Sequence, residues 1–255
     1  MKTITSEADQ IKALNEQEYA NRQQLIDYLF RAPIPREELA NNLALFMDRR
    51  ILSRILFMNE LYSHIVGLHG SIIEFGTRYG SNLSLFTSLR GIYEPFNHNR
   101  KVIAFDTFEG FPDVVAEDAN AVQDWKKGDY GVPDQYEDFL STILRLHEQS
   151  APLPNIEKFE LVKGDVTKTL RPFLEERQET IIALAYFDFD LYKPTKETLE
   201  QILPYLTKGA VLGFDQINAK EWPGETRALR EVLGTRNFRI RHSAFRGTSG
   251  YLIFE

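Results

Sequence analysis

The feature of this 255-residue chain that most constrains its fold is an alternation, after Gly70, of short apolar runs with helix-length segments. The apolar runs end in small or acidic residues, which is typical of strands in α/β proteins. We expect strands at residues 71–75, 101–105, 158–162, 181–187 and 210–214. The intervening helices are expected to begin near Gly80, Thr167, Pro194 and Pro223. Because parallel strands need crossover connections, which are usually helices, the alternation predicts an α/β fold with a mostly parallel, doubly wound sheet.

The C-terminal segments depart from this alternation. Residues 238–245 and 248–254 are apolar and flank the turn signal Arg246-Gly247, so we expect an antiparallel hairpin. Dinucleotide-binding folds end in parallel strands. A parallel sheet closed by an antiparallel hairpin instead resembles the class I methyltransferase architecture, which is Rossmann-like and has seven strands.

Two helices are expected ahead of the sheet, at residues 15–31 and 36–68, because Pro33 and Pro35 interrupt the helical pattern between them. The second segment carries an apolar stripe at helical spacing, which predicts a surface that packs against the α/β domain or a second subunit. The stripe consists of Leu39, Leu43, Met47, Ile51 and Ile55, extended by Tyr62 and Val66. We therefore expect a helical extension at residues 1–69, an α/β domain at 70–255, and a homodimer.

The interval 107–155 is too long for a plain connection between two strands, and we interpret it as an insertion. Residues 134–149 carry Phe139, Ile143 and Leu146 at helical spacing and predict a helix. The preceding part is rich in Gly, Asp and aromatic residues and has no clear period. Long loops in compact domains are usually functional, so we expect the insertion to shape a substrate pocket.

Composition excludes several classes of function. Lys and Arg number 30 against 37 Asp and Glu, a net charge of −7, so no excess positive field exists to hold nucleic acid. The absence of cysteine excludes disulfides, thiolate metal sites and cysteine nucleophiles. The longest apolar run, 181–187, is too short to span a membrane, and the polar start MKTITSEADQ lacks a signal-peptide core. We expect a cytoplasmic protein without membrane partners.

Residues 72–81 predict a strand, a glycine turn and the start of a helix. Glycines at 76 and 80 let backbone amides approach a ligand closely, and a helix start suits a carboxylate or phosphate group. The dinucleotide pattern G-x-G-x-x-G is absent, and Glu74 precedes the first glycine. The turn therefore suits a cationic ligand better than a pyrophosphate. The alternative is a tight turn that serves packing alone.

Two acidic residues are candidate nucleoside ligands. Asp106 follows a strand and can accept hydrogen bonds from both ribose hydroxyls, or it organises the following loop. Asp165, within Gly164-Asp165-Val166, can accept from an adenine amino group. Its alternative role is to cap the helix that begins near Thr167.

Oxygen-bearing side chains also follow the last two expected parallel strands: Asp188 and Asp190, then Asp215 and Gln216. Carboxyl ends of parallel strands meet at the crevice where doubly wound sheets bind ligands, so we expect these groups to converge. Hard oxygen ligands suit Mg²⁺, Ca²⁺ or Mn²⁺. The alternative is that one Asp caps a helix and the others pair with Lys193 or arginines.

Two other residues near this crevice are weaker candidates. The five histidines show no ligand-like spacing, and only His242, expected on a strand edge facing the crevice, is considered as an auxiliary base. Trp222 lies just past the Asp215 loop, where it forms a wall of an acceptor pocket or simply packs.

Between Ile72 and Gln216 the sequence resembles the macrocin O-methyltransferase (TylF/MycF-type) family of S-adenosylmethionine-dependent enzymes, which act on sugar hydroxyls of natural products. The resemblance rests on E-F-G-T-R-Y-G-S, F-D-T-F-E-G-F-P, D-x-D-L-Y-x-x-T from Asp188 to Thr195, and the acidic strand end at Asp215. The chain departs from the family pattern at Asp215-Gln216, where Asp-Asp is usual, and at Gly80-Ser81, where Gly-Gly is usual.

The resemblance implies roles for these residues. It places Glu74, Gly76 and Gly80 around the amino acid part of S-adenosylmethionine, Asp106 at its ribose, and Phe108 and Asp165 near its adenine. The segments implied in cofactor binding are Glu74, Gly76, Thr77, Arg78, Gly80, Ser81, Asp106, Thr107, Phe108, Gly164, Asp165, Val166 and Asp188. It also implies that Asp188, Asp215 and Gln216 hold Mg²⁺ or another divalent ion that engages the acceptor.

The expected activity is O-methylation of a sugar or another small acceptor of natural-product biosynthesis. An acceptor oxygen attacks the sulfonium methyl group, and Asp188 or Asp190 accepts the proton. Positioning and a bound cation supply the acceleration. The alternatives are an NAD-dependent oxidoreductase, disfavoured by the missing glycine pattern, and a catalytically silent cofactor-binding or scaffold protein, suggested by Gln216.

Overall fold

A computed structural model describes residues 16–119 and 124–255. Seven strands form one sheet in the order β3-β2-β1-β4-β5-β7-β6. The first five are parallel, and β7 pairs antiparallel with both β5 and β6. The strands are β1 (Ser71–Phe75), β2 (Val102–Asp106), β3 (Phe159–Lys163), β4 (Ile182–Phe187), β5 (Leu206–Phe214), β6 (Arg241–His242) and β7 (Gly250–Ile253). The expected parallel sheet with an antiparallel C-terminal hairpin is confirmed.

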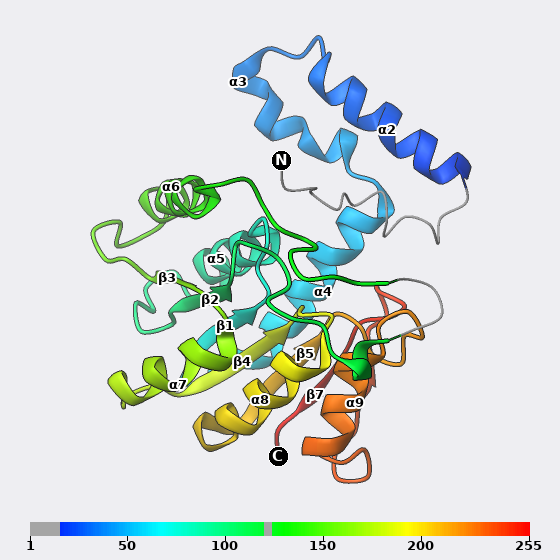
Figure 1. The fold of residues 1–255 in the computed structure, drawn as a ribbon. Helices are drawn as coiled ribbons and strands as arrows, with labels where there is room; N and C mark the ends of the chain where they lie inside the picture. Colours follow the sequence, from blue (N-terminus) through cyan, green and yellow to red (C-terminus); the bar gives the residue numbers. More distant parts are fainter. Residues whose placement is uncertain (1–15, 120–123) are drawn as a thin grey trace.

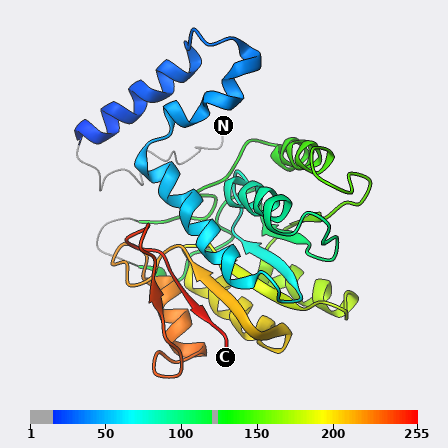
Figure 2. The same ribbon diagram turned by 180° about the vertical axis from the view of Figure 1, so that it is seen from behind.

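Helices cover both faces of the sheet (Figures 1 and 2). The helices of one face are α4 (Arg49–Ile65), α5 (Ser81–Tyr93) and α6 (Tyr136–Gln149), and those of the other are α7 (Val166–Glu176), α8 (Tyr192–Ile202) and α9 (Pro223–Val232). Short 3₁₀ helices are η3 (Ala116–Asp118) and η4 (Leu203–Tyr205). Alternate residues of each central strand enter the two cores, as Ile72 and Ile73 do, so the strands are apolar throughout.

The N-terminal helices form an arm that stands off the body of the molecule (Figure 2). It consists of α2 (Glu16–Phe30), α3 (Arg36–Leu39) and the 3₁₀ helix η2 (Ala40–Phe46), and α4 leads from it into the sheet. The predicted continuous helix 36–68 is wrong. Asp48 adopts an extended conformation and accepts hydrogen bonds from the amides of Arg50 and Ile51, so a new helix begins there.

This break also changes which residues of α4 face the core. The buried face consists of Phe57, Met58, Leu61, Tyr62 and Ile65. Of the predicted stripe, Tyr62 is buried, whereas Leu43, Met47, Ile51 and Val66 are exposed. Leu43 and Met47 precede the break at Asp48, Ile51 lies in the first turn of α4, and Val66 is its C-cap. Division of the chain at residues 69 and 70 stays a prediction.

In α6 too, the predicted apolar face differs from the face that is buried. The helix is present, but Phe139 and Leu146 are exposed, whereas Leu140 and Leu144 enter the core beside α5. Both sets have helical spacing, so periodicity alone could not choose between the two faces.

Within the described residues, no helix combines the length and apolar character that a membrane crossing needs.

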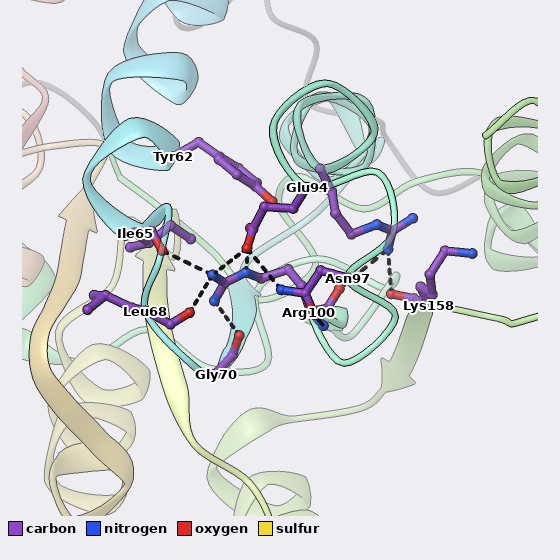
Figure 3. Close-up of polar contacts among 9 residues, drawn as sticks. Tyr62, Ile65, Leu68, Gly70, Glu94, Asn97, Arg100 and Lys158 are labelled. Carbon is purple, nitrogen blue, oxygen red and sulfur yellow. Dashed lines mark hydrogen bonds and ion pairs between the residues drawn. The ribbon is translucent and has the colours of Figure 1, made fainter. Parts of the chain in front are cut away.

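Buried charges gather at the edge of the sheet where β1, β2 and β3 begin (Figure 3). We call this group the paired cluster: Arg90, Glu94, Arg100, Glu148 and Lys158. Each cation of the cluster meets a carboxylate, at distances of 2.5–2.9 Å. The cluster is therefore electrostatically compensated inside the protein.

Arg100 joins α4 to the sheet (Figure 3). Its guanidinium donates to the carbonyl oxygens of Ile65, Leu68 and Gly70, and to the Glu94 carboxylate at 2.9 Å. These carbonyls lie where α4 ends and β1 is about to begin, and a helix end leaves carbonyls in need of donors. Burial would raise the pKa of Glu94, but the hydrogen bonds from Arg100 and its neighbours outweigh it and lower that pKa.

Candidate active site at the carboxyl ends of the strands

A cavity of about 790 Å³ opens at the carboxyl ends of the parallel strands. It lies at the position where the strand order reverses between β1 and β4, which is where doubly wound sheets bind ligands. Its volume falls within the range typical of small-molecule sites. The cavity also reaches Arg22 of α2 and Arg50 of α4, so the N-terminal arm forms part of its wall.

Most residues predicted from the sequence line this cavity. The lining ones are Gly76, Thr77, Arg78, Ser81, Asp106, Thr107, Gly164, Asp165, Val166, Asp188, Asp190, Asp215 and Gln216. Glu74, Gly80 and Phe108 are outside the described lining, and Glu74 and Phe108 are buried. Trp222 lines the cavity. His242 is exposed on β6 and outside the described lining, so the expectation that it faces the crevice is wrong.

The glycine turn after β1 brings two loops into contact. Gly76 has φ +88°, and a Cβ atom there would collide with the Asp188 carbonyl oxygen. The Asp188 amide donates to the carbonyl of Phe75 at 2.8 Å, which holds the loop after β4 against this turn. A side chain at position 76 would separate the two walls that predicted cofactor residues form.

Asp106 is held by the backbone of both neighbouring loops. Its carboxylate accepts from the amides of Arg78 at 2.7 Å and Phe108 at 2.6 Å. Burial raises the pKa of Asp106, and these amides oppose the shift. The loop-organising role considered from the sequence is thus present, on a residue that also lines the cavity.

Asp165 caps α7. It accepts from the amide and hydroxyl of Thr167 at 3.1 and 2.7 Å, and it pairs with Lys168 at 3.2 Å. Burial would raise the pKa of Asp165, but the hydrogen bonds from Thr167 and Lys168 outweigh it and lower that pKa. The capping alternative therefore describes its contacts, and its position on the cavity wall leaves a ligand contact open.

Five carboxyl groups meet at the cavity floor, and we call them the acidic cluster: Glu74, Asp188, Asp190, Asp215 and Glu225. Burial raises the pKa of Glu74 to about 8, with Asp188 adding to the effect. Burial and then Asp215 raise the pKa of Asp188 to about 7. The pKa values of Asp190 and Glu225 are raised well above their usual range by burial and by neighbouring carboxylates. The raised pKa values indicate that these carboxyl groups resist ionising together in the empty protein.

Several acceptor atoms of this region are also unsatisfied. Glu74 Oε1, Asp190 Oδ1 and Gln216 Oε1 are buried and have no hydrogen-bond partner among the described residues. Asp190 adopts φ +62°, a strained conformation for a residue other than glycine. Buried acceptors normally find donors, so these atoms indicate a ligand that carries donors or positive charge.

Asp215 is the exception within the acidic cluster, because it has partners on every side. It accepts from the Tyr186 hydroxyl at 2.7 Å and from the side-chain nitrogen Nε2 of Gln216 at 2.8 Å. Arg246 Nη2 lies 3.1 Å from one carboxylate oxygen and 3.3 Å from the other. Burial, followed by the charge of Asp215, raises the pKa of Tyr186 well above its usual value.

One wall of the cavity carries the side chains predicted to hold a divalent ion. Asp188, Asp215 and Gln216 lie together and offer hard oxygens, including the unpartnered Gln216 Oε1, which fits Mg²⁺. Arg246 competes for Asp215. Residues 16–119 and 124–255 contain no group of three or more His, Cys, Asp or Glu side chains arranged as a metal site, so the amide of Gln216 would have to complete the set.

Sequence reasoning missed Glu225, which fastens the floor of the site. Its carboxylate accepts from the amides of Asp190 and Gln216, both at 3.2 Å. It therefore joins the loops after β4 and β5. Glu225 lies in the first turn of α9, directly after Pro223-Gly224, and an acidic first turn following a predicted helix start was the available signal.

Sequence reasoning also missed the basic wall. The arginines on the arm side of the cavity are Arg22, Arg49, Arg50 and Arg54. Arg50 and Arg54 are four apart on α4, a spacing that puts both on one helix face. This spacing was the signal in the sequence that could have identified them.

Aromatic residues from the insertion close another side. Trp125 stacks on Trp222 with ring centroids 4.2 Å apart, and Phe111 and Tyr130 pack around them. Asp118 accepts from the Tyr192 amide at 2.6 Å and so fastens the insertion to the start of α8. The insertion thus forms a wall, as expected for a segment that shapes a pocket.

Two solved structures are similar to nearly the whole chain. One is CalS11, described as a calicheamicin methyltransferase, with 43% identity over 94% of this chain and 93% of that chain and a TM-score of 0.90. The other is an apo structure of CalS11, described as a TDP-rhamnose 3'-O-methyltransferase of calicheamicin biosynthesis, with 40% identity, 94% and 95% coverage and a TM-score of 0.83. These likenesses confirm the class I, Rossmann-like methyltransferase fold.

A third structure supports the fold alone. The O-methyltransferase NovP shares 17% identity over 79% of each chain, with a TM-score of 0.60. A scan against protein-family models and a search of curated proteins give no match.

Proposed function

The chain belongs to the S-adenosylmethionine-dependent O-methyltransferases of the macrocin O-methyltransferase type, and from that premise we propose that it methylates a hydroxyl group of a sugar at this cavity. The sugar is supported by the similarity to CalS11, which is described as acting on TDP-rhamnose. The scaffold and oxidoreductase alternatives have no comparable support.

One observation carries the proposal: an acidic cluster with raised pKa values lies at the strand switch point, beside a glycine turn that borders the cavity. S-adenosylmethionine carries an ammonium group and a sulfonium, which are the charges such a cluster favours. An NAD pyrophosphate would add negative charge to the same place. The electrostatics therefore support the methyltransferase cofactor over the dinucleotide.

The cofactor-binding residues are assigned accordingly. The turn Gly76–Ser81 and Glu74 would hold the amino acid part of the cofactor, and Glu74 Oε1 is an unsatisfied acceptor ready for its ammonium group. Asp106 would hold the ribose, while Asp165 and Val166 border the adenine side. Phe108 is buried in the core and supports the Asp106 loop from behind.

Asp190 is the proposed proton acceptor. When bound, S-adenosylmethionine supplies an electrophilic methyl group, whose bond to sulfur breaks as the acceptor oxygen attacks the carbon. Asp190 lines the cavity, and its buried Oδ1 has no hydrogen-bond partner among the described residues. Burial and neighbouring carboxylates raise the pKa of Asp190, and a positive charge bound nearby would ionise the carboxyl group so that it can accept a proton. Glu225 holds the Asp190 backbone and so fixes the position of this base.

A divalent ion is a narrower part of the proposal. Asp188, Asp215 and the Gln216 amide oxygen would hold Mg²⁺, and a bound ion would lower the pKa of the acceptor hydroxyl. Activity should then fall in excess chelator and return with Mg²⁺. Unchanged activity in chelator would instead assign the counter-charge at Asp215 to Arg246.

The arm supports the proposed homodimer. Tyr28 and Phe30 of α2 and Leu45 of η2 are 64%, 83% and 68% exposed, and clustered exposed apolar side chains often mark an interaction surface. A second copy of the chain would cover them. Sedimentation equilibrium of the whole protein measures this directly, and a monomer at micromolar concentration would contradict it.

Incubation with S-adenosylmethionine, Mg²⁺ and a panel of free and nucleotide-linked sugars tests the activity. A gain of about 14 daltons, the mass of one added CH₂, is the expected result by mass spectrometry, accompanied by S-adenosylhomocysteine. Absence of both products with every sugar would overturn the sugar acceptor, and absence of cofactor binding would overturn the methyltransferase proposal itself.

A further inference from the structure

One of the two carboxylates predicted to hold a divalent ion is already in contact with a cation. Arg246 Nη2 lies 3.1 Å from Asp215 Oδ1 and 3.3 Å from Asp215 Oδ2. The Tyr186 hydroxyl also donates to Oδ1, and Gln216 Nε2 donates to Oδ2. Each oxygen of Asp215 therefore has two donors, which match the roughly two lone pairs that a carboxylate oxygen offers. An ion that binds Asp215 has to take the place of one of these donors.

Among these three donors, Arg246 is the one whose side chain can leave. Tyr186 belongs to β4, is fully buried and packs edge-on against two phenylalanine rings. Gln216 directly follows Asp215 in the chain, so it stays beside this carboxylate. The side chain of Arg246 is long and flexible, retains 18% exposure and lines the cavity. It can therefore turn away from Asp215 into the cavity.

The backbone that carries Arg246 is anchored on both sides. Arg246 lies in the connection between β6 and β7, flanked by the buried residues Ser243 and Ser249. Ser243 Oγ donates to a carboxylate of α4 at 3.1 Å, and Ser249 Oγ donates to the backbone carbonyl of Asp215 at 2.9 Å. At the tip, a Cβ atom on Gly247 would meet no described atom within 4 Å. The anchors hold the backbone, and the open tip leaves the side chain room to move.

The charge of Arg246 acts on both predicted ion ligands. Burial and then Asp215 raise the pKa of Asp188 to about 7, and the charges of Arg54 and Arg246 oppose the shift. Asp188 Oδ2 accepts from Asn82 Nδ2 at 3.4 Å, which is a weak hydrogen bond. Arg246 thus reduces the repulsion between two carboxylates that a divalent ion would also compensate.

We propose that Arg246 is a displaceable counter-ion, which pairs with Asp215 in the free protein and turns into the cavity when Asp215 binds a divalent ion. The inference rests on the divalent ion of the proposed function. In both states Asp215 keeps a cation beside it, which limits the cost of burying its charge. The neutral amide of Gln216 would complete the ligand set, so the ion gains two carboxylates and Arg246 is an effective competitor.

Mn²⁺, titrated into the whole protein and followed by the electron paramagnetic resonance signal of the free ion, tests this competition. Arg246→Gln should bind Mn²⁺ about tenfold more tightly than the wild type, because one charge-assisted hydrogen bond no longer has to be broken. Arg241→Gln is the matched control, since Arg241 lies in β6 of the same hairpin but outside the described cavity lining. It should bind Mn²⁺ as the wild type does.

Methylguanidinium separates displacement from a purely structural role of Arg246. Arg246→Ala should also bind Mn²⁺ more tightly than the wild type, and added methylguanidinium should reverse this gain by occupying the place of the missing guanidinium. The same concentration should leave the wild-type affinity unchanged. If Arg246 serves only to fasten the hairpin, its loss should leave Mn²⁺ affinity equal or lower and methylguanidinium should have no effect. This result would overturn the proposal.

The remaining outcomes separate this inference from the proposed function. Absence of Mn²⁺ binding in both the wild type and Arg246→Gln, or equal tightening in Arg241→Gln, would overturn the displaceable counter-ion. S-adenosylhomocysteine binding in the same samples would leave the methyltransferase proposal intact. Tighter Mn²⁺ binding by Arg246→Gln without S-adenosylhomocysteine binding would have the reverse meaning. Circular dichroism shows whether each variant is folded, and Arg246→Ala provides the same test if Arg246→Gln is not.

Discussion

The protein buries charged groups at both ends of its parallel strands, but it pairs them at one end and leaves them partly unpaired at the other. At the edge where β1, β2 and β3 begin, the paired cluster matches Arg90, Arg100 and Lys158 with carboxylates at 2.5–2.9 Å. At the other edge, Glu74 and Asp190 each keep a buried oxygen without a partner in the described structure. The pKa of Glu94 is lowered in the first region, and that of Glu74 is raised to about 8 in the second.

This difference separates a structural network from a binding site. A buried ion pair holds elements together, and removal of one partner leaves an uncompensated charge. Unpaired carboxylates destabilise the empty protein and persist because a ligand compensates them. Mutations in the paired cluster should therefore lower stability, whereas mutations in the acidic cluster should lower cofactor affinity or kcat.

Arg100→Met should have the largest effect on stability. It would leave Glu94 without its ion pair and remove the donor from three backbone carbonyls. We expect a loss of about 3–5 kcal/mol in the free energy of unfolding, measured by denaturant titration. Arg145→Met is the matched control, because the Arg145 side chain is 58% exposed and its ion pair with Glu157 is long, at 3.6 Å. A loss of similar size in both variants would contradict the structural role.

Asp190→Asn should instead affect catalysis. Loss of the proposed base should lower kcat about 10²- to 10³-fold, the usual contribution of general base catalysis. Stability of the empty protein should stay equal or rise, since the variant removes a buried charge that other carboxylates repel. Steady-state kinetics and thermal melting measure the two effects. A catalytic rate within threefold of the wild type would assign the proton acceptor elsewhere.

Glu74→Gln should weaken cofactor binding by about tenfold, the value of one charge-assisted hydrogen bond. The amide retains the size of the carboxyl group but cannot offer a negative charge to the ammonium of the cofactor. Calorimetry with S-adenosylhomocysteine gives the affinity. Glu148→Gln, in the paired cluster, should leave that affinity unchanged while lowering stability. A loss of affinity in Glu148→Gln, or unchanged affinity in Glu74→Gln, would contradict these roles.

The pH dependence of the empty protein should show the smallest effect. Because the folded pKa of Glu74 is about 8 and that of Asp188 about 7, both above the ordinary values, their protonation stabilises the folded state. This contribution is fully present below about pH 4, where both unfolded groups are protonated, and is lost as pH rises through 7 and 8. The melting temperature should fall from pH 6 to 9, and Glu74→Gln should flatten the decline.

Sequence predicted the scaffold because its signals are local. The five parallel strands and the C-terminal hairpin follow from short apolar runs and turn residues, and their positions differ from the structure by a few residues. The faces of α4 and α6 were not predictable. The cap at Asp48 separates the first from the segment before it, and two equivalent apolar stripes competed in the second.

The site was predictable only on the strand-end side. Asp106, Asp188 and Asp215 directly follow strands, so topology alone places them together. Glu225 and the arginines on the arm side of the cavity enter from helices whose approach depends on tertiary packing. The pairing of Arg246 with Asp215 spans 31 residues and was invisible to spacing rules for the same reason.

Calorimetric titration of S-adenosylmethionine at pH 7, repeated in two buffers of different ionisation enthalpy, tests the central claim most directly. A cationic ligand beside carboxyl groups with pKa values of about 7 and 8 should drive their ionisation, so we predict binding with net proton release. Equal heats in both buffers, or no binding at all, would show that the acidic cluster is not the cofactor site.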